Sequence, residues 1–175
     1  MFLIAEQPGV IRMHGMLRHS LVNGPGIRCV LFLQGCTHHC PGCQNPETHD
    51  IHGGTPCSIQ AILNDILTDR NLDGVTLSGG DPLLQPKACT EITKACKQHG
   101  LSVWVYTGYL FEDVYTEKLG KDAANLLQYI DVLVDGLFDE ALKSETCLWC
   151  GSTNQRLIDV PASLSNQGKP ILFKL

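Results

Sequence analysis

The residues best suited to chemistry lie in the segment 36–43, which reads Cys-Thr-His-His-Cys-Pro-Gly-Cys. Its cysteines, Cys36, Cys40 and Cys43, have the spacing C-x3-C-x2-C, and the residues between them are polar or turn-forming, so we expect a loop. Thiolates are soft ligands that select iron–sulfur clusters, zinc or copper(I). A [4Fe–4S] cluster normally takes four cysteines. Three cysteines would leave one iron with an open coordination position, which is where a metal centre does chemistry.

Histidines near this loop leave a zinc site open as an alternative. One imidazole would complete a tetrahedral ligand set with the three thiolates. The candidates for this fourth ligand are His38, His39, His49 and His52. The cysteine spacing favours the cluster, and His38 and His39 are most simply interpreted as loop residues beside it.

The other cysteines among the nine in the chain are interpreted as structural. Three lie in segments with apolar periodicity and are expected in the core: Cys29, Cys89 and Cys96. Cys57, just before a predicted helix, is also expected to be structural. Cys147 and Cys150 form a C-x2-C pair, a spacing typical of a redox site or of half a zinc site. Because no second pair in the sequence completes a zinc site, we interpret them as incidental thiols.

The composition is that of a soluble globular domain. The chain has 175 residues, of which 43% are apolar and 18% are charged, and its net charge is -5. This length predicts a single domain over residues 1–175, and the negative charge argues against nucleic-acid binding. No apolar run approaches the roughly 20 residues of a membrane helix, and residues 1–10 lack the pattern of a secretory signal. An odd cysteine count without an export signal indicates a reducing compartment, so we expect the protein in the cytoplasm.

The elements that would position these residues alternate between strands and helices. Short apolar segments predict buried strands at residues 28–34, 74–78, 102–107 and 131–136. Helices are predicted at residues 58–69 and 86–99, with further helical segments within 110–130. They are followed by a predicted strand at 156–160, a helix from Pro161 and a last strand at 170–175. Residues 1–20 are weakly patterned and predict an edge strand at 10–13 or a flap.

This order of elements predicts an α/β fold with a parallel sheet and right-handed crossovers. The strands are too few for a closed eight-stranded barrel, so we expect an open, partial barrel with helices on its outer face. In parallel α/β folds the functional site lies at the carboxyl ends of the strands. The strand-end segments should therefore converge on one rim: 36–45, 78–82, 106–109, 135–136 and 151–155.

Several motifs in this order resemble those of the radical S-adenosylmethionine activating enzymes. The cysteine loop is preceded by Asn-Gly-Pro-Gly-Ile-Arg at 23–28. It is followed by Ser-Gly-Gly-Asp-Pro-Leu at 78–83, Val-Tyr-Thr-Gly-Tyr at 105–109, Asp-Val-Leu-Val-Asp-Gly at 131–136 and Gly-Ser-Thr-Asn-Gln-Arg at 151–156. Together these motifs are similar to those of the activating proteins of anaerobic (class III) ribonucleoside-triphosphate reductases, and the resemblance covers most of the chain.

The resemblance implies a radical S-adenosylmethionine domain, which is a partial parallel β/α barrel. Cys36, Cys40 and Cys43 would hold three irons of a [4Fe–4S] cluster, and the fourth iron would take the amino and carboxylate groups of S-adenosylmethionine. One electron would cleave this cofactor to methionine and a 5′-deoxyadenosyl radical. The radical would take a hydrogen atom from a backbone glycine of the reductase and leave a glycyl radical there. A flavodoxin-like protein is the implied electron donor.

The resemblance also implies which residues contact S-adenosylmethionine. These positions are Asn45, Ser78, Gly79, Gly80, Asp81, Tyr106 and Asp135. The glycines would let backbone carbonyls reach the methionine ammonium group. Asp81 stands where many relatives have Glu. Gly42 stands where many radical S-adenosylmethionine enzymes have an aromatic residue near the adenine, so that contact would come from elsewhere, with the backbone and Tyr106 as the candidates. Asp135, which closes a predicted strand, is equally typical of a turn residue.

Three other functions remain open at this point. Pyruvate formate-lyase activases would share the cysteine loop, but they are longer and usually have a different third-strand motif. A small-molecule radical enzyme, such as a 7-carboxy-7-deazaguanine synthase, would have a similar size. The motif around Asn154 and the absence of an Asp-Thr pair after Cys43 argue against that enzyme. A zinc-binding adaptor, which clamps a partner and does no chemistry, would contain zinc without iron or sulfide.

Overall fold

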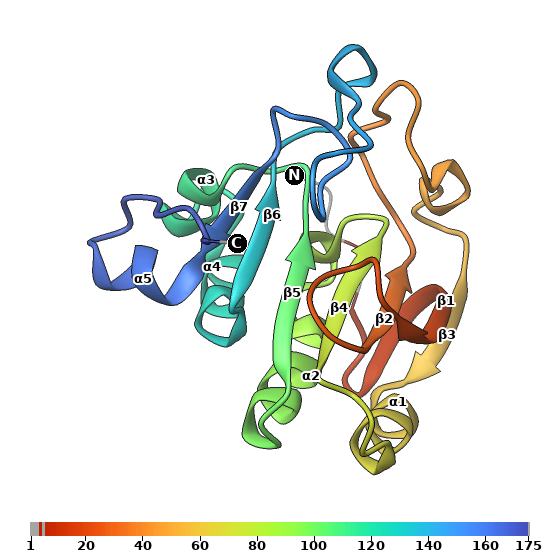
Figure 1. Cartoon of the computed structure of the whole chain (residues 1–175). Helices are drawn as coiled ribbons and strands as arrows, with labels where there is room; N and C mark the ends of the chain where they lie inside the picture. The colour runs from red at the N-terminus through yellow and green to blue at the C-terminus, as the bar shows by residue number, and fades with distance from the viewer. Residues whose placement is uncertain (1–3, 5, 175) are drawn as a thin grey trace.

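The computed structural model describes residues 4 and 6–174, which form one seven-stranded sheet with helices packed against it (Figure 1). In chain order the strands are β1 (Val10–Ser20), β2 (Arg28–Leu33), β3 (Thr55–Ser58), β4 (Gly74–Gly79), β5 (Ser102–Tyr106), β6 (Val132–Asp135) and β7 (Arg156–Asp159). The α-helices are α1 (Ile59–Thr68), α2 (Pro86–Gln98), α3 (Phe111–Tyr115), α4 (Lys121–Leu126) and α5 (Val160–Ser165). Single turns of 3-10 helix are η1 (Pro46–Thr48), η2 (Pro82–Leu84), η3 (Leu127–Tyr129) and η4 (Glu140–Leu142).

The spatial order of the strands is β3-β1-β2-β4-β5-β6-β7, so the sheet is open, with β3 and β7 at its edges. The central strands β2, β4, β5 and β6 are parallel, which confirms the predicted buried strands. On one side of these strands β1 pairs antiparallel with β2 and β3, and on the other side β7 pairs antiparallel with β6. The sheet is therefore mixed, and the prediction of a parallel sheet is wrong for these outer strands. A parallel neighbour needs a long crossover, usually a helix. The segment 136–155 between β6 and β7 contains only η4, so β7 returns antiparallel to β6.

The N-terminal part of the sheet also differs from the prediction. β1 has 11 residues and lies between β2 and β3, so it is an interior strand and not an edge. Only its first residues show alternating burial, with Ile11 and Met13 in the core, whereas residues 17–19 are exposed. This explains why the sequence predicts a strand at 10–13 alone. The sequence does not predict β3 because its residues are exposed or half-buried and show no apolar alternation.

The C-terminal elements are closer to the prediction. The strand at 156–160 is confirmed as β7, and the helix from Pro161 as α5, which begins one residue earlier. The predicted last strand at 170–175 is reduced to a single bridge between Leu172 and Ile158. Residue 175 of that strand, and residues 1–3 and 5 of the N-terminal segment, lie outside the described part of the chain.

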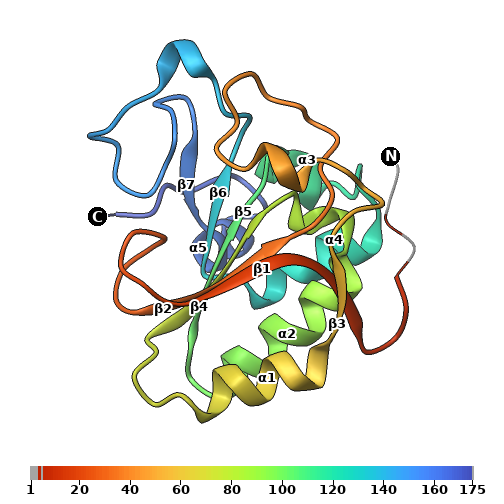
Figure 2. The same ribbon diagram turned by 90° about the vertical axis from the view of Figure 1, so that its right-hand side faces the viewer.

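Helices α1, α2 and α4 cover one face of the sheet, and Figure 2 shows them together on that side. Side chains of the central strands alternate between the two faces. Toward the helices they form the main core, which includes Leu31, Leu77, Val105 and Leu133 and also the buried cysteines Cys29, Cys89 and Cys96. Toward the other face, Trp104, Val132 and Val134 form a second cluster, against which Tyr106, Trp149 and Phe173 pack. None of the helices within residues 4 and 6–174 is long and apolar enough to cross a membrane.

Candidate metal centre

A cavity of about 700 Å³ opens at the carboxyl ends of the parallel strands. Cys36, Cys40 and Cys43 line it, together with residues from the ends of β4 and β5 and from the segment 136–155. In Figure 1 the loop after β2 and the segment before β7 both rise above this end of the sheet. The strand-end segments therefore converge on one rim, as the order of elements predicts.

The cysteine loop begins just after β2 and is held in place by its backbone. Cys36 N donates a hydrogen bond to His49 O at 3.2 Å, and Cys43 N donates to Cys40 O at 3.1 Å. Asn45 N donates to Cys43 Sγ at 3.4 Å. The three thiols are free and half-buried. The loop therefore presents three soft sulfur donors to one cavity, a donor set that fits an iron–sulfur cluster.

Two thiols of this loop, those of Cys36 and Cys40, favour the protonated form when no metal is bound. Burial raises the pKa of the Cys36 thiol to about 11, and burial also raises the pKa of the Cys40 thiol. Metals bind thiolates, so metal binding at these thiols must release protons.

Across residues 4 and 6–174, no three His, Cys, Asp or Glu side chains are grouped to hold a single metal ion.

Two glycines at the end of β4 are required by close backbone packing. Gly79 has a φ of +90°, and a Cβ atom there would lie 2.7 Å from Leu33 N. A Cβ atom on Gly80 would overlap Gly35 O. Gly80 N donates to Leu33 O at 2.9 Å, and Asp81 N donates to Gly35 O at 2.8 Å. A side chain at either glycine would separate the end of β4 from the start of the cysteine loop.

The Asp81 carboxylate lines this junction, and its side chain is only 2% exposed. It accepts hydrogen bonds from Leu83 N at 2.9 Å, from Gly108 N at 3.0 Å and from Thr107 Oγ1 at 2.8 Å. His38 Nε2 lies 2.8 Å from Asp81 Oδ2. Because protein donors occupy both oxygens, Asp81 is a positioning residue that connects three segments. His38 is part of this network, although the sequence indicates only a loop residue.

The structure brings most of the candidate cofactor contacts to the cavity: Asn45, Ser78, Gly79, Gly80, Asp81 and Tyr106. Asp135 is not among the lining residues. Its fully buried carboxylate accepts from Phe111 N at 2.8 Å and from Arg156 Nε at 2.9 Å. Arg156 also pairs with Glu112, and this bond lowers the pKa of the Glu112 carboxyl. Asp135 therefore fixes the start of α3 to β7, and its position does not support a cofactor contact.

Another part of the cavity lining comes from the segment 144–151, which contains a disulfide between Cys147 and Cys150. Their interpretation as incidental thiols is therefore wrong. Tyr106 OH donates to Trp149 O at 2.9 Å, and this bond ties the segment to β5. The C-x2-C spacing is the available sequence signal, but nothing in that spacing places the pair at the cavity. The apolar lining residues Leu21, Val22, Phe32 and Phe138 have no sequence signal.

Arg28, the last residue of the motif at 23–28, is fully buried at the start of β2. Its guanidinium donates to Thr76 Oγ1 and to Ser102 Oγ, both at 2.7 Å, and lies 5.7 Å from the centroid of the Trp104 ring. Burial lowers the pKa of Arg28 to about 10, so the side chain remains charged at neutral pH. It anchors the turn that contains the cavity residue Asn23 to β4 and β5.

The three free thiols that line the cavity fit an iron–sulfur protein, and the family comparison places the chain in that class. Residues 22–158 match the family model described as a 4Fe-4S single cluster domain. The matched region is most of the chain, and it contains the cysteine loop and all the parallel strands.

Curated relatives narrow this class. The anaerobic ribonucleoside-triphosphate reductase-activating protein of Escherichia coli (strain K12) is 38% identical over 146 residues, which are 78% of this chain and 90% of that protein. The proteins of the same name from Salmonella typhi and from Enterobacteria phage T4 are both 37% identical, over 83% and 79% of this chain and 96% and 87% of those proteins. The chain therefore belongs to the family of anaerobic ribonucleoside-triphosphate reductase-activating proteins, which are enzymes.

Among solved structures, QueE from Escherichia coli aligns with a TM-score of 0.47 and 17% sequence identity, over 57% of this chain and 53% of that chain. A likeness this low supports no argument about fold or function.

Proposed function

We propose that this protein is a radical S-adenosylmethionine enzyme that generates the glycyl radical of an anaerobic ribonucleoside-triphosphate reductase. In this role Cys36, Cys40 and Cys43 would hold a [4Fe–4S] cluster, and S-adenosylmethionine would bind at the iron that they leave open. When bound, these groups would supply reductive cleavage of the cofactor to methionine and a 5′-deoxyadenosyl radical, the species that would take a hydrogen atom from a backbone glycine of the reductase. The sheet is then a partial barrel, with the cavity on its inner face.

The observation that best supports this role is that three free thiols and the glycine motif of β4 share one cavity. Its volume of about 700 Å³ lies within the range of small-molecule sites, which is roughly 300–1,000 Å³. The curated relatives are named for anaerobic ribonucleoside-triphosphate reductase. These names favour that reductase over pyruvate formate-lyase as the protein substrate.

The chain's own residues would position the cofactor and exclude water. Ser78, Gly79 and Gly80 offer backbone polar groups, and Asn45 offers a side-chain amide. The ring of Tyr106 offers an apolar surface for a base. Because the radical chemistry belongs to the bound groups, the protein contributes orientation and shielding from solvent. Asp81 contributes indirectly, through its bonds to the cysteine loop.

Two further parts of the proposal concern the cellular setting. The electron donor is a flavodoxin-like protein, and the enzyme acts in the cytoplasm. The support for the donor is the family resemblance of the motifs, and the support for the location is that the described chain has seven free cysteines and a single disulfide.

Product and radical analysis together test the proposed function. Protein reconstituted without air, reduced with dithionite and mixed with S-adenosylmethionine and the reductase should form methionine and 5′-deoxyadenosine. The reductase should then show the electron paramagnetic resonance signal of a glycyl radical, and a reductase with that glycine replaced by alanine should not. Cys36→Ala should abolish both products. Cofactor cleavage without a radical on the reductase would point to another substrate. Zinc without iron or sulfide in air-free protein would support the adaptor and overturn the enzyme function.

A further inference from the structure

A second pair of sulfur atoms lies on the same cavity as the three cysteines of the loop. Cys147 and Cys150 are joined by a disulfide, with their Cα atoms 5.6 Å apart, and both are half-buried and line the cavity. All other cysteines of the described chain are free. The molecule thus places one disulfide bond on the cavity that contains its candidate metal site.

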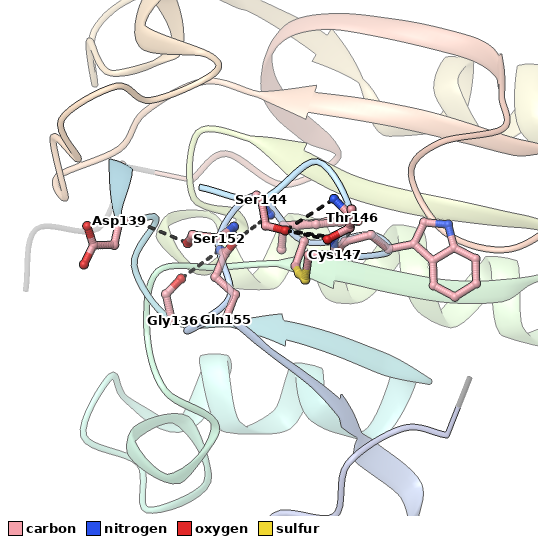
Figure 3. Close-up of a disulfide and its surroundings, with 11 residues drawn as sticks. Gly136, Asp139, Ser144, Thr146, Cys147, Ser152 and Gln155 are labelled. Atoms are coloured by element: carbon pink, nitrogen blue, oxygen red, sulfur yellow. Dashed lines mark hydrogen bonds between the residues drawn. A yellow bond between two sulfur atoms is a disulfide. The ribbon is translucent and has the colours of Figure 1, made fainter. Parts of the chain in front are cut away.

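This disulfide contributes little to holding the chain together. It joins positions only three apart in sequence, and a crosslink stabilises a fold by an amount that grows with the length of the loop it closes. Backbone hydrogen bonds already close the base of this segment: Ser144 N donates to Gly151 O at 3.2 Å, and Thr153 N donates to Leu142 O at 2.9 Å. Within the segment Ser144 Oγ accepts from Cys147 N at 3.2 Å, and just after it Gln155 Nε2 donates to Gly136 O at 3.0 Å (Figure 3). A structural role therefore does not account for the bond.

One of the two residues enclosed by the disulfide ring has an unfavourable backbone conformation. Trp149 has a φ of +58°, in the left-handed region that bulky residues rarely adopt. Its ring packs edge-on against Trp104, with ring centroids 5.2 Å apart, and its carbonyl oxygen accepts the bond from Tyr106 OH. Because a closed ring restricts Trp149, opening the disulfide frees this residue to relax. Its contacts with β5 would then change.

We propose that Cys147 and Cys150 form a thiol–disulfide exchange site whose co-reactant is a dithiol. A thiolate of the dithiol attacks one sulfur atom of the disulfide, which forms a mixed disulfide and releases the other cysteine as a thiolate that takes up a proton. The second thiol of the co-reactant then attacks the mixed disulfide. The co-reactant leaves as its own disulfide, and both cysteines end as thiols. Two electrons and two protons pass from the dithiol to the protein.

The exchange also sets the state of the cavity wall. In the disulfide form, Trp149 is held against Trp104 and Tyr106, so the segment 144–151 is fixed to β5. In the dithiol form, Trp149 is free to leave these contacts, while the hydrogen bonds at the base of the segment keep its ends in place. The effect on S-adenosylmethionine binding rests on the proposed function, whereas the exchange chemistry does not.

A redox titration of the full chain tests the exchange. Air-free, reconstituted protein is equilibrated with reduced and oxidised dithiothreitol, or with glutathione buffers for more oxidising conditions, then alkylated and digested with trypsin. Cleavage after Lys143 and Arg156 releases the peptide 144–156, which contains Cys147 and Cys150 and no other cysteine. We expect this peptide to carry no alkyl label in oxidising buffer and two labels in reducing buffer, and to change reversibly between the two. Two labels in the most oxidising buffer, or no label in excess reduced dithiothreitol, would overturn the exchange site.

Three variants separate the exchange from its effect on the wall. Cys147→Ser and Cys150→Ser should each give one label at every dithiothreitol ratio. The chain has two tryptophans, Trp104 and Trp149, so wild-type indole emission should differ between the two redox states. Trp149→Phe should lose most of that difference while its peptide still changes labels. Identical wild-type emission in both states would overturn the link between the disulfide and the cavity wall.

Discussion

His38 Nε2 and Asp81 Oδ2 lie 2.8 Å apart, and this pair joins the cysteine loop to the glycine motif at the end of β4. The side chains are only 14% and 2% exposed. Gly108 provides the space for the imidazole, because a Cβ atom there would lie 2.6 Å from the His38 ring. The pair therefore fixes the loop with the candidate metal ligands to two neighbouring strand ends.

His38→Phe should loosen this loop while it keeps the ring contact with Tyr109, whose centroid is 4.5 Å away. The substitution removes one partner of a buried carboxylate, so we expect a loss of about 1–3 kcal/mol in the free energy of unfolding. Urea denaturation measures this loss, and the iron bound after anaerobic reconstitution should fall as well. His39→Asn, at the exposed neighbouring position, is the control and should change stability by less than about 0.5 kcal/mol. Equal losses in the two variants would contradict the role of the pair.

Gly80→Ala should separate the end of β4 from the cysteine loop, because the new Cβ would overlap the backbone oxygen of Gly35. Backbone cannot move aside as a flexible side chain can, so we expect destabilisation of about 3 kcal/mol or more. Thermal unfolding and iron content should both report it. Gly15→Ala is the matched control, because a Cβ there would meet no heavy atom within 4 Å. A Gly80→Ala protein as stable as the control would show that the junction is less tight than the structure indicates.

Glu112→Gln should change how stability depends on pH. The bond to Arg156 lowers the pKa of Glu112 in the folded protein. At pH 7 the carboxylate is ionised in both states, so its pairing contributes in full. As the pH falls through the usual range of glutamate toward the lowered folded value, the unfolded state binds the proton first and the contribution is lost. The wild type should therefore be more stable than the variant at pH 7, and this gap should close in acid.

Urea denaturation between pH 7 and pH 3 measures this gap. Glu91→Gln, at an exposed position of α2, serves as the control and should show a smaller and flatter difference from wild type. A gap for Glu112→Gln that stays constant over the whole range would contradict the ion pair.

Arg28→Lys should destabilise the protein even though it keeps the charge. The guanidinium donates to several acceptors at once, including Thr76 Oγ1 and Ser102 Oγ, and an ammonium group cannot reproduce this fork. Buried acceptors left without a donor cost about 1–3 kcal/mol each, so we expect a loss of that order or somewhat more by urea denaturation. Arg70→Lys, at an exposed position, should have no measurable effect. An Arg28→Lys variant that is as stable as the wild type would show that the turn at 23–27 does not depend on this anchor.

The sequence predicts the parts of this structure that are set by local patterns. The central strands are continuous apolar segments, and the face of α1 with Ile59, Ile62 and Ile66 has helical spacing, so both are predicted correctly. β3 is half-exposed and exists because it pairs with β1, a contact that no local pattern encodes. Likewise, the direction of β7 depends on how the chain crosses between strands.

The site divides in the same way. The spacing of the three loop cysteines is local, so the sequence alone identifies them as candidate ligands. The burial of Asp135 against Arg156 depends on how α3 and β7 meet, and the position of Cys147 at the cavity depends on the path of a long connection. Both are therefore visible only in three dimensions.

Mössbauer spectroscopy of protein reconstituted with 57Fe under strictly air-free conditions tests the central claim most directly. Three cysteine ligands leave one iron of a [4Fe–4S] cluster without a protein thiolate. We predict that addition of S-adenosylmethionine changes the spectrum of one iron site and leaves the other three unchanged. Four sites that are all unaffected by the cofactor, or the absence of any cluster, would contradict the account.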